Sequence, residues 1–271
     1  LDKDDNGTSD IVLIASGIGG DLTLTSGAAA GITDSGTVTV AGNLVATTDA
    51  NNGVITLDQT AVTGTVALTT NGSGNATVDN GTLNLDLAAS NVGGNLTVTS
   101  GASAGITDSG TVTVGGNLSA TTDANNGVVD LGTAAVDGTV ALTTNGTGNA
   151  TIVNDAGLNL AASTMGGTFS GTATTGNITD SGALAITGTT TLVTSADDAT
   201  ITLDTATNAF TGALTITTND SSGTDADVTI DGGTTALIIA ASTIDGDLTL
   251  TSGNSSGITD TGTVTVGGNL V

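Results

Sequence analysis

The stretch Gly20-Asp-Leu-Thr-Leu-Thr-Ser-Gly27 is the clearest guide to the fold, because it returns along the chain in nearly the same form. It reappears as Gly94-Asn-Leu-Thr-Val-Thr-Ser-Gly101, again at 246–253, and as a degenerate copy at 167–171. Its apolar and polar residues alternate, which is typical of a β-strand with one buried face. Self-similarity at a nearly fixed period predicts a solenoid, in which each repeat packs only on its neighbours.

A second phrase, Ile-Thr-Asp-Ser/Thr-Gly, follows the first in every long repeat. Its copies occupy 32–36, 106–110, 178–182 and 258–262. The order of the phrases is kept while their spacing varies, so we expect insertions between coils. We interpret residues 1–271 as one continuous solenoid, in which 1–19 form a partial coil. The long repeats are then approximately 20–93, 94–166, 167–245 and a partial 246–271.

A shorter repeat lies inside the long one. Strands of the Leu-Thr-Leu-Thr type recur at a mostly constant interval, and their first apolar residues are Leu22, Leu44, Val66, Leu96, Leu118, Val140, Phe169, Leu214, Leu248 and Leu270. Between Phe169 and Leu214, Thr191 takes the apolar position of an imperfect copy, with an inward Leu192 as the alternative. This count predicts three unequal coils in each long repeat.

Each coil divides again at Gly, Asn or Asp, the residues that favour turns. Three short alternating strands per coil predict an all-β, triangular, parallel β-solenoid of roughly eleven coils. The alternative, a row of tandem β-sandwiches, would need longer units and aromatic core residues. We expect stacked Leu, Val, Ile and Ala inside, with Met165, Phe169 and Phe210 filling wider layers.

The two ends of the sequence match each other. Read from Leu270-Val271 directly into Leu1, the chain resembles the internal stretch 42–53, and the interval from Leu270 to Leu22 across that join equals an ordinary coil. We therefore expect the 271 residues to be one axial period of a longer fibre. The partner would be the protein itself, through a tandem-repeat chain or head-to-tail stacking of subunits. About eleven coils at about 4.8 Å predict an axial repeat near 53 Å.

Composition excludes several functions. The chain has 42 Gly and no Pro, Cys, His, Trp or Tyr; all 26 acidic residues are Asp, and Lys3 is the one basic residue. A net charge of −25 excludes electrostatic binding of nucleic acid, because nothing could neutralise phosphates. The longest apolar run, Ala236–Ala241, is too short to span a bilayer. We expect neither nucleic-acid binding nor membrane insertion.

With these phrases in view, the sequence resembles bacterial β-strand-repeat surface proteins, among them the filamentous-haemagglutinin-like adhesins. The resemblance covers the whole chain and rests on composition and coil pattern. It implies a secreted, right-handed β-helix that forms a long fibre, located outside the cell or on its surface. It also implies attachment to glycans or to a cell surface, although the chain has no Arg and so no Arg-Gly-Asp sequence.

Catalysis finds little support in these residues. Without His, Cys, Tyr, Arg or Glu, most pairs of nucleophile and base cannot be built. Pairs of Asp can hydrolyse glycosides, but basic residues to hold an acidic sugar are missing apart from Lys3. We expect no enzyme, no catalytic residues and no organic cofactor.

Calcium is the one cofactor that the sequence suggests. Asp2, Asp4, Asn6 and Asp10 place oxygen donors at intervals around Gly7, like the front of a calcium-binding loop. The bidentate Glu that completes an EF-hand is missing. The alternative is a polar insertion between coils without a metal.

Two outward patterns remain. The aspartates of the second phrase, Asp34, Asp108, Asp180 and Asp260, could stack as an acidic row of turn-forming residues. Coils three apart lie roughly 14 Å from each other, beyond the Debye length of about 8 Å, so we expect little repulsion. Thr-x-Thr strands such as Thr23-Leu-Thr25 suggest an alternative function, ice binding, which requires two parallel ranks of Thr on a flat face.

Overall fold

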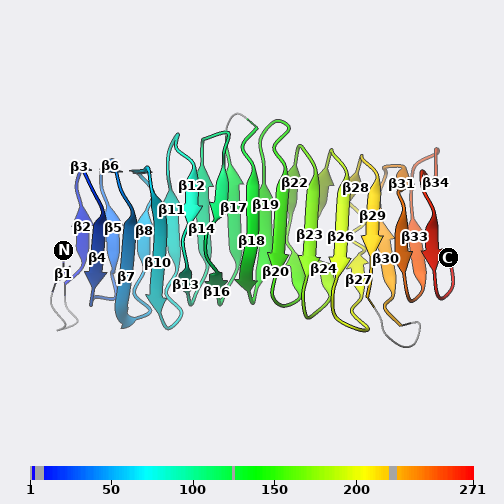
Figure 1. The fold of residues 1–271 in the computed structure, drawn as a ribbon, viewed down its shortest axis with the longest axis horizontal. Helices are drawn as coiled ribbons and strands as arrows, with labels where there is room; N and C mark the ends of the chain where they lie inside the picture. The colour runs from blue at the N-terminus through cyan, green and yellow to red at the C-terminus, as the bar shows by residue number, and fades with distance from the viewer. Residues whose placement is uncertain (1, 4–8, 124–125, 220–224) are drawn as a thin grey trace. The chain divides into compact units, whose positions relative to one another are not determined.

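The computed structural model describes residues 2–3, 9–123, 126–219 and 225–271. In this part the chain is all-β, a parallel β-solenoid of about 11 turns with three parallel sheets and no helix (Figure 1). The predicted fold class is confirmed. No helix long and apolar enough to cross a membrane is found among these residues.

Residues 1–138 form one compact unit. Its strands in the first sheet are β1 (Asp2–Lys3), β4 (Leu22–Ser26), β7 (Leu44–Asn51), β10 (Thr65–Asn71), β12 (Leu85–Leu87), β13 (Ser90–Val92), β15 (Ile106–Asp108), β16 (Val112–Val114) and β18 (Val129–Val136). The second sheet contains β2 (Ile11–Leu13), β5 (Ile32–Asp34), β8 (Ile55–Leu57), β11 (Ala76–Asp79), β14 (Leu96–Ser100) and β17 (Leu118–Thr122). The third sheet contains β3 (Ser16–Ile18), β6 (Val38–Val40) and β9 (Thr60–Val62).

Residues 139–271 form a second compact unit. Its strands in the first sheet are β20 (Ala150–Asn154), β23 (Phe169–Ala173), β26 (Thr190–Thr194), β29 (Leu214–Thr217), β31 (Leu237–Ile239), β32 (Ser242–Ile244), β34 (Ile258–Asp260) and β35 (Val264–Val266). Those in the second sheet are β19 (Thr139–Thr143), β21 (Leu158–Leu160), β22 (Ser163–Met165), β24 (Ile178–Asp180), β25 (Leu184–Ile186), β27 (Ile201–Leu203), β28 (Ala209–Phe210), β30 (Val228–Asp231) and β33 (Leu248–Thr251).

The turns that begin at β4 and β7 each consist of one longer strand and two short ones. In the first unit β4, β5 and β6 make one turn, and β7 then lies beside β4 with Leu22 paired to Leu44. The prediction of three strands per coil is therefore confirmed. Every second side chain is buried, as the strand period of two requires. The interior is a stack of Leu, Val, Ile and Ala in which Met165, Phe169 and Phe210 are fully buried, as predicted.

The predicted three coils per long repeat are wrong, because one long repeat advances three and a half turns. Leu22, Leu44, Val66 and Leu87 follow one another in the first sheet, whereas Leu96 lies in the second sheet beside Ala76. The stretch from Val66 to Leu96 thus covers one and a half turns. Equivalent phrases therefore alternate between the two large sheets. The second unit shows the same alternation, with β23 in the first sheet and β33 in the second.

The strand at Thr190–Thr194 is shifted by one residue from the main prediction. Thr190, and not Thr191, pairs with Phe169 and Leu214 and points inward. Leu192 is fully buried, which confirms the alternative. A run of Thr carries no alternation of its own, so the neighbouring strands set its register.

Candidate functional site

The Gly-Asp/Asn-Leu phrase forms a ladder of side-chain hydrogen bonds along the solenoid. The Oδ1 of Asp21 accepts the backbone N–H of Asn43 at 2.8 Å, one turn further on. The Oδ1 of Asn43 in turn accepts the N–H of Thr65 at 2.9 Å. Further along, the Oδ1 of Asn75 accepts the N–H of Asn95, and the Oδ1 of Asn95 accepts the N–H of Asn117, each at 2.8 Å. We call these residues the Asx ladder.

The glycine of the phrase makes room for this ladder. A Cβ on Gly42 would overlap the Oδ1 of Asp21, and a Cβ on Gly64 would overlap the Oδ1 of Asn43. Each glycine thus lets the backbone of one turn approach the Asx side chain of the turn before it. The sequence alone revealed the phrase but not these hydrogen bonds between turns. The pattern that could have predicted them is the recurrence of Gly next to Asp or Asn at the interval of one turn.

The aspartates of the second phrase hold the bend of the following turn. Asp34 accepts the N–H groups of Asp58 and Gln59 at 3.3 and 3.0 Å. Asp108 accepts those of Gly132 and Thr133 at 3.0 and 2.7 Å, together with the Thr133 hydroxyl at 2.8 Å. A carboxylate that receives two backbone donors needs no other ligand to explain its position.

In the second unit Asp180 has the same place. Its carboxylate accepts the backbone N–H groups of Asp204 and Thr205 at 3.2 and 3.4 Å. The Asn208 side-chain amide donates a further hydrogen bond at 2.6 Å. The predicted acidic row is wrong, because Asp34 lies in the second sheet and Asp108 in the first, and the second unit divides Asp180 and Asp260 in the same way.

The acidity of Asp34 is altered by its surroundings. Burial raises the pKa of Asp34 above the usual value, and the neighbouring Asp58 carboxyl raises it further. The hydrogen bond from the backbone of Gln59 lowers the same pKa. On balance the pKa of Asp34 is raised, so Asp34 in the folded chain takes up a proton at a higher pH than a free aspartate does.

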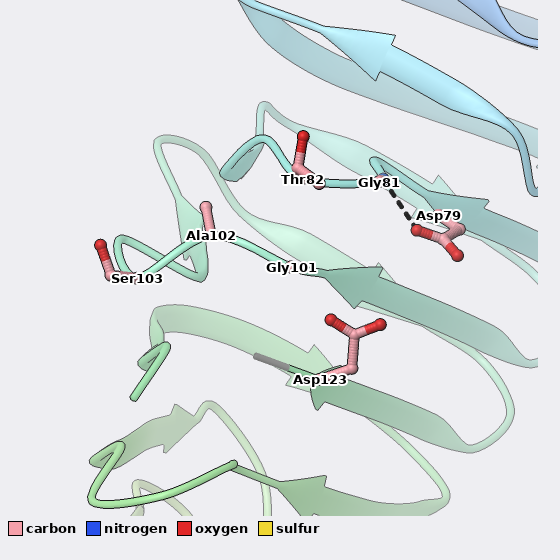
Figure 2. A pocket seen from close by; sticks show the side chains of 7 residues that line it. All are labelled: Asp79, Gly81, Thr82, Gly101, Ala102, Ser103 and Asp123. Carbon is pink, nitrogen blue, oxygen red and sulfur yellow. Dashed lines mark hydrogen bonds between the residues drawn. The ribbon is translucent and has the colours of Figure 1, made fainter. Parts of the chain in front are cut away.

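One hollow opens at a corner of three successive turns in the first unit (Figure 2). Its volume is about 670 Å³, and its lining residues are Asp79, Gly81, Thr82, Gly101, Ala102, Ser103 and Asp123. Asp79 accepts the N–H of Gly81 at 2.8 Å, and a Cβ on Gly101 would sit 3.1 Å from the Oδ1 of Asp123. Figure 2 shows the two carboxylates on different turns. The hollow offers oxygen atoms but no pair of nucleophile and base.

The predicted calcium loop falls mostly outside the described residues, which exclude Asp4 and Asn6. The backbone of Asp2 is in β1, paired with Thr25, and Asp10 is exposed just before β2. The calcium site therefore stays a prediction. Over the ranges that the structure describes, no group of three or more His, Cys, Asp or Glu could hold a metal ion.

The register of the strands shows how the outward Thr side chains line up, which is the feature that the ice-binding alternative requires. On β4, β7 and β10 the outward residues Thr25, Thr47 and Thr69 form one rank. The rank beside it contains Thr23, Val45 and Ala67. This face thus has one continuous rank of Thr, where the alternative requires two.

A family model described as "Repeats of unknown function (DUF5649)" matches residues 4–71, 73–145, 147–217 and 225–271. Comparison with curated proteins and with solved structures gives no match. The four matches cover nearly the whole chain, and they begin at other points of the period than the two phrases do. The chain belongs to this family of repeats.

Proposed function

We propose that this member of the DUF5649 repeat family is a structural segment of an extracellular filament or stalk, and that it is not an enzyme. The observation that carries the proposal is the Asx ladder, in which Asp21 and Asn43 each offer one turn the same acceptor. Each of these turns thus provides the next turn with the same hydrogen-bond acceptor at the same position. A chain built in this way lengthens by adding repeats, without a new kind of contact.

The family matches support this interpretation, because four tandem units follow one another along the chain. The carboxylates of the second phrase support it as well. Asp34 and Asp108 hold the bend of the next turn, which is a structural task. These hydrogen bonds give the carboxylates a structural role that accounts for their positions.

The composition argues against catalysis. The hollow in the first unit presents Asp79 and Asp123, but the sequence has no His, Cys, Tyr, Arg or Glu to serve as their partner. Asp79 also accepts a hydrogen bond from the backbone N–H of Gly81 in its own turn.

The extracellular location rests on the resemblance to bacterial β-strand-repeat surface proteins. The partner that we propose is the same repeat, as further copies that continue the solenoid along its axis. The resemblance adds a second proposal, attachment to glycans or to a cell surface. Ice binding is not proposed, since the rank of Thr23, Val45 and Ala67 interrupts the second Thr row.

Immunogold electron microscopy of cells that produce the protein tests the proposal. We expect label along filaments or stalks outside the cell envelope. A matched fractionation should recover the protein with surface material and not with the cytoplasm. Label confined to the cytoplasm, or diffuse label with no extended structure, would contradict the proposed function.

A further inference from the structure

The charge of this protein lies mainly on its outside. The sequence has 26 Asp and one Lys, for a net charge of −25. The fully buried polar residues of the described part are Ser, Thr and Asn, and no described Asp is among them. With a single Lys in the sequence, salt bridges can neutralise almost none of this charge. Most described aspartates therefore keep contact with water, although the Oδ1 of Asp86 and the Oδ2 of Asp245 are buried.

This charge is dense along the solenoid axis. About 11 turns carry the 25 net charges, which is about 2.3 per turn. Since adjacent strands lie about 4.8 Å apart, one net charge falls on every 2 Å or so of axis. Double-stranded DNA carries one charge per about 1.7 Å. The linear charge densities of the two polymers are thus close.

At this linear charge density, water alone does not reduce the repulsion between neighbouring charges to the thermal energy. Two unit charges in water interact with the thermal energy, about 0.59 kcal/mol, at a separation of about 7 Å. The axial spacing here is about a third of that distance, and polyanions in this regime keep a condensed layer of counterions. The half-turn alternation of the repeats spreads the charge, because Asp34 lies in the second sheet and Asp108 in the first.

We propose that the solenoid is a linear polyanion that binds flexible oligo-cations of the polyamine class along its turns, through release of condensed counterions. The described residues contain no group of three carboxylates that could hold a metal ion, and the binding that we propose is spread along the turns. Affinity is set by the valence of the ligand. Ammonium groups also find hydrogen-bond acceptors in the outward Thr, Asn and Asp oxygens. This inference does not depend on the proposed filament function.

Calorimetric titration with spermine, a tetravalent cation, at low and at high NaCl concentration tests the proposal. The expected slope of log K against log salt is about −3.5, from about −0.9 per charge neutralised. About six spermine molecules should bind per chain, because 25 net charges are available. No binding at low salt, a slope shallower than about −1, or a single saturable site would each overturn the inference.

Two sets of charge-matched variants separate distributed binding from a discrete site. Each set changes four exposed aspartates to Asn and avoids carboxylates that accept the hydrogen bonds described above. The first set is Asp49, Asp130, Asp137 and Asp155, and the second is Asp10, Asp198, Asp204 and Asp260. Both sets should lower the bound spermine equally, to about five per chain, with an unchanged circular-dichroism spectrum. Loss of binding in one set alone would overturn the inference.

Discussion

Replacing Thr190 by Val should stabilise the solenoid locally, which is unusual for a single substitution. Thr190 is fully buried in β26 between Phe169 and Leu214. Its Oγ1 has no hydrogen-bond partner. A buried polar group without a partner costs about 1–3 kcal/mol, and the methyl group that replaces it adds about 0.8 kcal/mol of apolar burial. Val has the same shape, so we expect a net gain of about 2 kcal/mol.

Thr194 provides the matched control on the same strand. It is equally buried, but its Oγ1 donates to the carbonyl oxygen of Ala199 at 3.2 Å. Thr194→Val leaves that oxygen without its donor, so we expect a loss of about 1 kcal/mol. The two substitutions make the same chemical change at the same depth. Opposite signs would therefore arise from the hydrogen bond alone.

Amide hydrogen exchange is the suitable assay, because a solenoid can open locally and need not unfold in one step. A gain of about 2 kcal/mol corresponds to roughly thirtyfold slower exchange in β23, β26 and β29 of the Thr190→Val protein. Thr194→Val should accelerate exchange about fivefold in the same strands. Faster exchange in the Thr190→Val protein would show that the unpaired Thr190 hydroxyl does not destabilise this layer.

Three further substitutions test other parts of the account. Asn43→Ala removes the acceptor of the Thr65 N–H group and should cost about 1 kcal/mol of stability. We expect this loss as faster amide exchange in β7 and β10. Unchanged exchange would show that the Asx ladder does not stabilise the solenoid. Leu96→Asp places a charge in the dry interior at a cost of several kcal/mol. Amide exchange should become faster only in the neighbouring turns. Loss of protection throughout the chain would contradict the solenoid model. Because the pKa of Asp34 is raised, its charged form destabilises the fold above that pKa, and this destabilisation disappears as the pH falls through the pKa. Relative to the Asp34→Asn variant, the wild type should therefore show slower amide exchange as the pH falls from about 7 towards about 4. The opposite trend would contradict the raised pKa of Asp34.

The sequence predicted the architecture because short strands repeat with clear alternation. The buried Met165, Phe169 and Phe210 were predicted for the same reason. The register of β26 could not be read with certainty, since Thr190 and Thr191 are chemically identical and Thr fits either face. Only pairing with Phe169 and Leu214 selects the inward residue.

The half-turn advance of the repeat could not be read from the sequence either. Between Val66 and Leu96 the chain contains β12 and β13, two short strands that do not resemble the Leu-Thr-Leu-Thr type. The sequence therefore predicted that Leu96, and not Leu87, begins the coil after Val66. Asp34 and Asp108 could be identified as turn residues, but their acceptance of N–H groups one turn away depends on which strands become neighbours.

Cryo-electron microscopy of a doubled chain, with Val271 of one copy joined to Leu1 of the next, would show whether the solenoid continues from one copy into another. If each turn is a template for the next, the strand ladder should run through the joint at about 4.8 Å spacing. The doubled chain should then show about twice the 11 turns of one copy. Two separate solenoids connected by an irregular segment would contradict the account.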